Sequence, residues 1–260
     1  MKIAVIGAGE MGGAFVNGLL SSNIIKPENI TVSNPHEGKL KPFAERGTSV
    51  TTDNKVAAAM ADIVVLAVKP KVVKKVIDEI KEEMDYGKQA IVNMAANIKL
   101  EQLEAWMISG GDVPAICQAI PNIAIAKRKS MTFLTPNSKA AAHLKPIQSV
   151  FDELGMTMVV DEELLSAGTA MAGCGIALVL RFIRAASEAG VELGFHADKA
   201  KDVVMQTIEG AGALLADGEH PEALIDKVTT PGGMTIKGLN ALEDAAFTRA
   251  VIAGFKGCLK

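Results

Sequence analysis

Short, uninterrupted runs of apolar residues mark the first half of the chain, and amphipathic stretches separate them. Runs of this kind predict strands that are buried on both faces, as in a parallel sheet covered by helices. We expect strands at residues 3–6, 30–32, 63–68, 90–96 and 114–120, a short extended piece at 49–52, and one or two more strands at 131–134 and 156–160. We expect helices at 11–20, 37–46, 73–84, 100–107 and 138–154, and another that begins after Asp53 and Asn54.

The pattern changes after Asp161, where strand signals stop and long helical patterns rich in Ala, Gly and Leu begin. Residues 167–180 are apolar on all sides, which predicts a buried core helix because about 14 residues are too few for a membrane span. Residues 200–215 predict an amphipathic helix, and two more helices follow Pro221 and Phe247. The fold class is therefore an α/β Rossmann-type dinucleotide-binding domain (1–160) followed by an all-α C-terminal domain (161–260).

The first predicted strand leads directly into a glycine-rich turn of the form G-x-G-x-x-G. One glycine permits a tight turn, the second lets the backbone approach a pyrophosphate, and the third lets the helix pack closely on the strand. The candidate cofactor residues are Gly7, Ala8, Gly9, Glu10, Met11 and Gly12. The alternative is a structural turn that binds no phosphate, but the strand before the motif and the helix after it favour a dinucleotide site.

The end of the second strand indicates which dinucleotide is used. NAD sites usually place an acidic residue there, whereas this chain has Ser33 and Asn34, with Lys39 nearby. The missing carboxylate favours NADPH, with NADH as the alternative, and Ser33 and Asn34 are candidate ligands of the 2′-phosphate. The same residues also suit a simple turn. Ala95, at the end of the fourth strand, is small enough to let a nicotinamide ring approach.

Composition and charge narrow the function further. The chain has 260 residues, a net charge of −3, and 49% hydrophobic residues, without the basic cluster that nucleic-acid binding requires. Its three cysteines and four histidines lack metal-ligand spacing, so we expect no metal site. The first apolar run has only four residues, so we expect no signal peptide and no membrane anchor, and a cytoplasmic protein.

A second glycine-rich turn lies between the last helices, in the sequence DKVTTPGGMTIKGL. Pro231, Gly232 and Gly233 allow backbone N–H groups to converge on a carboxylate, and we expect Thr235 to cap a helix that starts at Ile236. The alternative is a tight turn followed by an ordinary capping threonine.

These motifs together closely resemble the Δ1-pyrroline-5-carboxylate reductase family over nearly the whole chain. The resemblance includes IGAGEMG at the start, LAVKP at 66–70, NMAANI at 93–98, IPN at 120–122 and DKVTTPGGMTIKGLNALE near the end. It implies reduction of the cyclic imine pyrroline-5-carboxylate to L-proline by NAD(P)H, the last step of proline synthesis. It implies nucleotide contacts from residues 7–11, Ser33, Asn54, Ala67, Val68, Lys69 and Pro70, and substrate contacts from Thr230, Gly233, Met234 and Thr235.

The chain departs from the family pattern at three places. Gln118 stands where an arginine is usual, Gly173-Cys174-Gly175-Ile176-Ala177-Leu178 replaces Gly-Ser-Gly-Pro-Ala-Tyr, and Lys227 replaces an asparagine. Two other functions stay open on the sequence alone. A β-hydroxyacid dehydrogenase shares the two-domain plan but needs a lysine on its long helix, and there is none between Gly168 and Gly190. The second is a nucleotide-binding protein that has lost catalysis.

The chemistry requires few residues, because a cyclic imine can arrive already protonated and receive a hydride directly. We expect the Thr235 hydroxyl to hydrogen-bond the ring nitrogen. The helices after Ala167 are too apolar to bury all their surface within one chain, so we expect a homo-oligomer, a dimer or a multiple of dimers.

Overall fold

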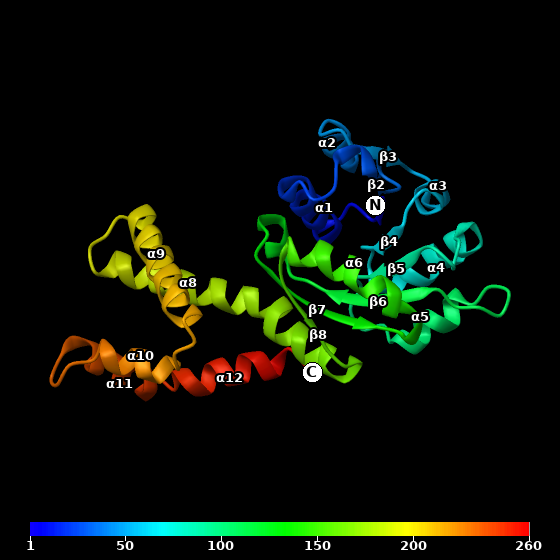
Figure 1. The fold of residues 1–260 in the computed structure, drawn as a ribbon. Helices are drawn as coiled ribbons and strands as arrows, with labels where there is room; N and C mark the ends of the chain where they lie inside the picture. Colours follow the sequence, from blue (N-terminus) through cyan, green and yellow to red (C-terminus); the bar gives the residue numbers. More distant parts are fainter. Residues whose placement is uncertain (260) are drawn as a thin grey trace. The chain divides into compact units, whose positions relative to one another are not determined.

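An eight-stranded sheet forms the core of the first part of the chain in the computed structural model, which describes residues 1–259 (Figure 1). Its strand order is β3-β2-β1-β4-β5-β6-β7-β8. All neighbouring strands are parallel except β6 and β7. The strands are β1 (Ile3–Ile6), β2 (Ile30–Ser33), β3 (Ser49–Thr51), β4 (Ile63–Leu66), β5 (Ala90–Asn93), β6 (Ala115–Ile120), β7 (Ser130–Pro136) and β8 (Gly155–Val159).

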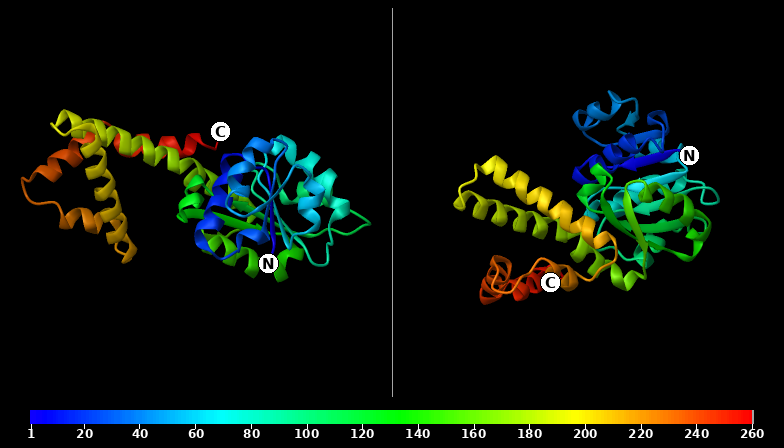
Figure 2. Two further views of the ribbon diagram at one scale, coloured as in Figure 1. Left: turned by 90° about the horizontal axis from the view of Figure 1, so that it is seen from above. Right: turned by 60° about the vertical axis from the view of Figure 1, so that its left-hand side comes forward.

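Helices cover both faces of this sheet, because its strands alternate apolar side chains between the two faces (Figure 2). Ile3 and Val5 of β1 pack with α1, α2 and α6, while Ala4 and Ile6 pack with α3, α4 and α5. The helices of this part are α1 (Glu10–Ser22), α2 (Lys41–Ala44), α3 (Asn54–Ala59), α4 (Pro70–Ile80), α5 (Leu100–Met107), α6 (Ala141–Asp152) and α7 (Leu165–Gly168). The predicted Rossmann-type sheet is confirmed.

Three predicted elements are shorter in the structure than in the sequence pattern. The strand expected to reach Ala96 ends at Asn93, because the Asn93 carboxamide oxygen accepts a hydrogen bond from the Ala95 amide and turns the chain. The strand expected to reach Val68 ends at Leu66. The helix expected at 37–46 is only a 3₁₀ turn followed by α2, with Pro42 in the first turn of α2.

The chain divides into two compact units, which meet at Gly173 and Cys174. The first unit extends past the expected boundary at Val160, since α7 packs on β7. Gly168 allows this contact: a Cβ atom there would lie 2.6 Å from the Phe133 ring. A π-helical turn (Thr169–Cys174) leads into the second unit.

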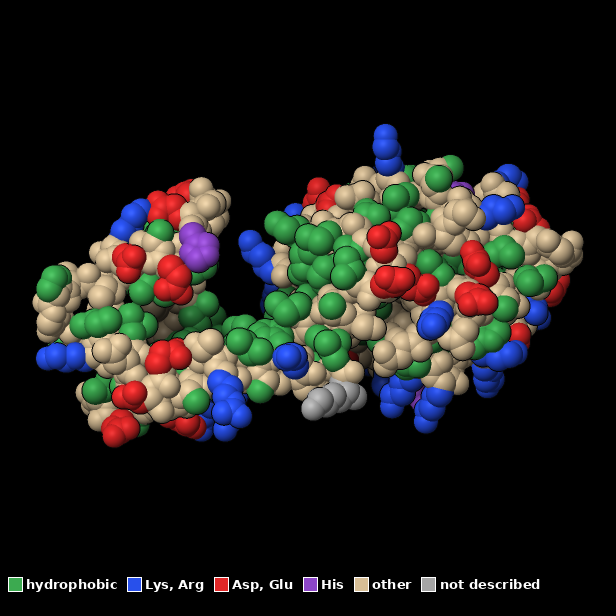
Figure 3. All heavy atoms as spheres, turned by 90° about the horizontal axis from the view of Figure 1, so that it is seen from below, with side chains coloured by type: hydrophobic (Ala, Val, Ile, Leu, Met, Phe, Trp, Pro, Cys, Tyr) green, Lys and Arg blue, Asp and Glu red, His purple; other side chains and the backbone are tan. Residues whose placement is uncertain are grey.

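The second unit is entirely helical, as predicted. Its helices are α8 (Gly175–Glu192), α9 (Ala197–Ala216), α10 (Pro221–Lys227), α11 (Met234–Asp244) and α12 (Phe247–Gly257). The prediction of a buried core helix at 167–180 is wrong for the single chain: Val179 and Leu180 are 47% and 54% exposed. Too few elements surround α8 to cover it, and Figure 3 shows hydrophobic side chains, in green, at the surface of this unit.

One helical stretch, Glu162–Glu192, has the length and composition to cross a membrane. It has 31 residues and a mean hydropathy of 1.6 over its most apolar segment, of which 22% is buried inside the chain. Core helices of other proteins pass the same test when they are covered by neighbours. Most of this stretch is therefore exposed apolar surface in the single chain.

Candidate active site

The glycine-rich turn after β1 has the geometry that its three glycines predict. Gly7 has a φ of +110° and donates its amide proton to the Ser33 carbonyl at 2.8 Å. A Cβ atom on Gly12 would lie 1.9 Å from the Gly7 carbonyl oxygen, so only glycine permits this approach of α1 to the turn. Gly9 is different, because nothing lies within 4 Å of its Cβ position. The open space at Gly9 is where a ligand can reach the backbone.

The N-terminus of α1 faces a pocket of about 610 Å³. Gly9 is the N-cap residue and makes no side-chain cap, so the first amides of α1 are available to an anion. Lys39 and Arg46 bring two positive charges to the pocket wall. The Arg46 guanidinium is held there by a 2.6 Å hydrogen bond to the Asn17 side chain. This pocket can hold a phosphate-bearing ligand.

The segment after β4 closes against the same turn. The Ala67 amide donates to the Ile6 carbonyl at 2.8 Å, and a Cβ atom on Gly7 would lie 2.5 Å from the Ala67 carbonyl oxygen and 2.9 Å from Val68 Cγ1. Lys69 then caps α4, which Pro70 begins. The structure therefore brings the predicted cofactor residues Ala67 and Val68 against the glycine-rich turn, and Lys69 and Pro70 follow them at the start of α4.

Ser33, Asn34 and Asn54 also lie together at the end of β2. The Ser33 hydroxyl donates to the Asn54 carboxamide oxygen at 2.7 Å, and the Asn54 amide donates to Glu79 at 2.7 Å. Asn34 accepts a hydrogen bond from the His36 amide at 3.0 Å. Ser33 and Asn34 are both buried. Since Ser33 already donates its only proton to Asn54, the Asn34 amide is the better placed of the two predicted phosphate donors.

Ala95 is supported by a buried polar network that the sequence pattern did not reveal. The Asn93 amide donates to the Ala95 carbonyl at 2.9 Å and to the Gln118 carboxamide oxygen at 2.8 Å. Gln118 in turn donates to the Ile98 carbonyl. The network fixes the turn at 95–98 beside a pocket of about 540 Å³, which Glu162 and Glu163 also line. The available signals were Asn93 and Gln118 themselves, which are polar residues within apolar strands.

The second glycine-rich turn lies in the helical unit and differs from the prediction in one respect. The Gly233 amide donates to the Thr230 carbonyl at 2.9 Å, and Gly232 has a φ of +69°. Gly233, not Thr235, is the N-cap residue, because α11 begins at Met234. Thr235 is thus an exposed residue of the first helical turn. The predicted capping role of Thr235 is wrong, and its hydroxyl is available to a ligand.

The described residues 1–259 contain no group of three or more His, Cys, Asp or Glu side chains that could hold a metal ion.

A covered, mostly parallel sheet with an open glycine-rich turn, joined to a helical unit, is typical of a dinucleotide-dependent oxidoreductase. Residues 2–97 match a family model described as "NADP oxidoreductase coenzyme F420-dependent". Residues 162–260 match a second model, described as "Pyrroline-5-carboxylate reductase dimerisation". The chain belongs to the pyrroline-5-carboxylate reductase family, as the relatives described next show.

A pyrroline-5-carboxylate reductase of Methanosarcina acetivorans is 34% identical over 258 residues, which cover 96% of this chain and 94% of that protein. Pyrroline-5-carboxylate reductase 1 of Dictyostelium discoideum is 37% identical over 97% of this chain, which spans about half (47%) of that longer protein. The crystal structure of a Plasmodium falciparum pyrroline carboxylate reductase with NADP bound superposes with a TM-score of 0.88, at 26% identity, and covers 100% of this chain and 95% of that one. The resemblance seen in the sequence is confirmed.

Proposed function

We propose that this chain reduces 1-pyrroline-5-carboxylate to L-proline with NADPH as the hydride donor, the last step of proline synthesis. The observation that carries the proposal is its similarity to the Methanosarcina reductase along 96% of its length. That length includes both glycine-rich turns. It also includes the apolar helical unit.

The first unit fits a dinucleotide by its own geometry. Gly9 leaves its Cβ position open, and the first amides of α1 lack partners in the helix. The dinucleotide, when bound, supplies the hydride. Residues 7–12 and 67–70 would hold its phosphates and ribose, and Ala95 would leave room for the nicotinamide. The Asn93–Gln118 network would keep Ala95 in place.

The second unit would hold the substrate at the turn before α11. The Gly233 amide is already bonded to Thr230, so the amides of Met234 and Thr235 are the ones available to the substrate carboxylate. The Thr235 hydroxyl would hydrogen-bond the ring nitrogen. The protonated imine then accepts the hydride without a stronger acid in the protein.

We also propose that the protein is a homo-oligomer, a dimer or a multiple of dimers, in a reducing cytoplasm. The match of residues 162–260 to a dimerisation domain supports self-association. So does the exposed apolar surface of α8.

The activity is tested by following NADPH oxidation with pyrroline-5-carboxylate and, in parallel, NADP⁺ reduction with β-hydroxyacids. We expect turnover only with the imine. Turnover of a hydroxyacid alone would indicate a β-hydroxyacid dehydrogenase instead. Tight NADPH binding without turnover of either substrate would indicate a protein that has lost catalysis.

A further inference from the structure

Two cysteines of the helical unit lie at the same end of a pair of packed helices. Cys174 immediately precedes α8, and Cys258 immediately follows α12. The two helices contact each other at two positions along their lengths. The rings of Phe182 and Phe247 are 6.4 Å apart, and a Cβ atom on Gly254 would lie 3.7 Å from both δ-methyl carbons of Leu178.

The spacing of these contacts places the two thiols together. Between the phenylalanine contact and the Leu178–Gly254 contact, residue numbers fall along α8, from 182 to 178, and rise along α12, from 247 to 254. The two helices are therefore antiparallel. Cys174 is four residues before Leu178, and Cys258 is four residues after Gly254. Each thiol therefore lies one helical turn beyond the Leu178–Gly254 contact, on the same face and in the same direction.

Side-chain contacts agree with this placement. The pKa of Cys174 is raised first by burial and then by the nearby Cys258. The Cys258 thiol also reaches back to the Gly254 carbonyl at 3.4 Å, which directs it along α12. Nothing lies within 4 Å of the Cβ position of Gly257, so the backbone beside Cys258 has space to adjust.

Solvent exposure distinguishes Cys174 and Cys258 from the third cysteine, Cys117. Cys258 is exposed and Cys174 is partly exposed, whereas Cys117 is buried in β6. Burial raises the pKa of the Cys117 thiol to about 12, so this thiol has almost no reactive thiolate at neutral pH. Reagents in solution can therefore distinguish the pair from Cys117.

We propose that Cys174 and Cys258 form a redox-reversible dithiol, which a low-molecular-weight disulfide of the glutathione type converts into an intrachain disulfide between α8 and α12. The exposed Cys258 thiolate attacks the disulfide, forms a mixed disulfide and releases one reduced thiol. The Cys174 thiolate then attacks Cys258 Sγ and releases the second reduced thiol. The two cysteines lose two protons and two electrons, and the small disulfide is reduced to two thiols.

The bond would close a loop that contains all five helices of the second unit. It would restrict the unfolded chain between residues 174 and 258, and it would hold the end of α12 on α8. We expect the midpoint temperature for unfolding of the helical unit to rise by about 5 °C on oxidation. This inference concerns the thiols alone and goes beyond the proposed reductase activity.

The test treats the native, full-length protein with mixtures of oxidised and reduced glutathione, blocks free thiols with iodoacetamide after denaturation, and measures intact mass without reductant. We expect the oxidised protein to lose two hydrogens, carry no glutathione and keep one blockable thiol, that of Cys117. Dithiothreitol should restore all three. C174S and C258S should each stop at a mixed disulfide with one glutathione, while C117A, the matched control, should still form the intrachain bond.

Three results would overturn the proposal. They are glutathione on both cysteines without an intrachain bond, a disulfide that links two copies of the chain, and no reaction of the native protein. Each of these masses is measured without any substrate. Failure of the reductase assay would therefore leave the result on the thiols unchanged, and failure of the thiol test would leave the proposed activity unchanged.

Discussion

At the scale of single residues, Thr235 provides the sharpest test of the proposed chemistry. Gly233 caps α11, so Thr235→Ala removes a hydroxyl but no helix cap. We expect the free energy of unfolding to change by no more than about 0.5 kcal/mol, as for an exposed substitution. If the hydroxyl hydrogen-bonds the ring nitrogen in the transition state, kcat should fall by roughly 10² to 10³.

The neighbouring Thr229 offers a matched control for this prediction. Its hydroxyl donates to the Ile225 carbonyl at 2.6 Å and is thus directed back to the end of α10. Thr229→Ala should therefore leave kcat within a few fold of the wild type, and Thr235→Ser should restore activity. Measurements of kcat and NADPH affinity for the three variants decide the question. A normal kcat in Thr235→Ala would remove Thr235 from the catalytic machinery.

A second prediction at this scale concerns the choice of cofactor. We expect a higher kcat/KM with NADPH than with NADH, because the strand end at Ser33 and Asn34 carries no carboxylate. Asn34→Asp keeps the acceptor for the His36 amide but adds a negative charge, so the turn should survive. It should lower kcat/KM for NADPH by on the order of tenfold relative to NADH, equivalent to about 1.4 kcal/mol.

Asn29→Asp is the control, since it adds the same charge just before the opposite end of β2. It should leave the ratio of the two kcat/KM values unchanged. An NADH preference in the wild type would contradict the assignment of this strand end to the 2′-phosphate.

At the scale of elements, two glycines at the start of α1 have different roles: Gly12 lets the helix pack on the turn after β1, and Gly9 leaves space for a ligand. A Cβ atom on Gly12 would lie 1.9 Å from the Gly7 carbonyl oxygen, so Gly12→Ala must push α1 away from the turn. We expect it to lower the free energy of unfolding by about 1–3 kcal/mol. Gly9→Ala meets no atom within 4 Å and should fold normally while it weakens NADPH binding.

Gly13→Ala is the stability control for Gly12→Ala, because its Cβ would lie 3.6 Å from the Phe43 ring, an ordinary contact. Thermal unfolding and NADPH titration of the three proteins give the two readouts. Equal stability of Gly12→Ala and Gly13→Ala would show that α1 does not depend on this close approach.

Elements with strong local signals were predictable from the sequence, and those set by distant contacts were not. The runs of β1 and β4 are apolar on both faces, and α5 was predicted with its observed bounds. The early end of β5 depends on a side chain that bonds to its own backbone. The reversed direction of β7 leaves no mark in its apolar pattern.

The residues of the candidate active site follow the same rule: those in a local motif were predictable from the sequence, and those joined by distant contacts were not. The glycine-rich turn is a local motif, so its residues could be assigned before the structure. The Asn54–Glu79 and Asn93–Gln118 hydrogen bonds join residues far apart in the chain, and no periodic pattern encodes such polar pairs. The start of α11 was predicted two residues too late, because Gly233 adopts the extended conformation of an N-cap and the helix begins at Met234.

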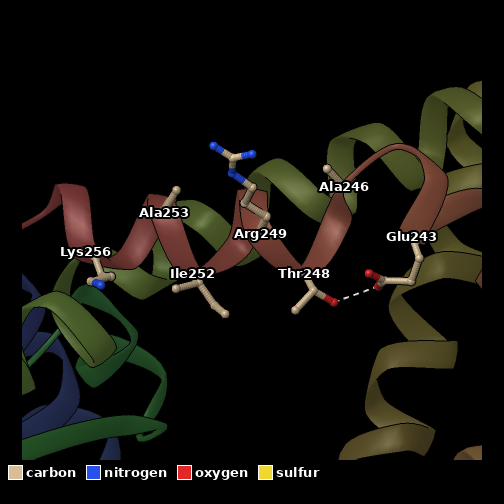
Figure 4. Close-up of a pocket in the computed structure, with 7 residues that line it drawn as sticks. All are labelled: Glu243, Ala246, Thr248, Arg249, Ile252, Ala253 and Lys256. Carbon is tan, nitrogen blue, oxygen red and sulfur yellow. Dashed lines mark hydrogen bonds between the residues drawn. The ribbon is translucent and has the colours of Figure 1, made fainter.

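At the scale of the whole molecule, an apolar groove of about 520 Å³ in the helical unit predicts self-association. Phe182, Phe247 and Phe255 line it. Figure 4 shows another side of α12, where apolar and charged side chains alternate: Arg249 and Lys256 lie beside Ile252, and the Thr248 hydroxyl donates to Glu243 at 2.7 Å. We expect light scattering at micromolar concentration to give a multiple of the 27.2 kDa chain mass.

Phe182→Glu should shift this mass toward the monomer, since it places a charge in the groove. Phe195→Glu adds the same charge at a half-exposed phenylalanine outside the groove, and should leave the mass unchanged. A monomeric wild type would contradict self-association through this unit.

The uncovered surface of α8 also has a consequence for how the protein reaches its final state. The first unit buries its apolar strands within its own sequence, so its folding is a first-order process. The helical unit, if a second copy covers it, completes its folding only on collision with that copy. Refolding from denaturant should then show one phase whose rate is independent of protein concentration and a later phase that accelerates in proportion to it.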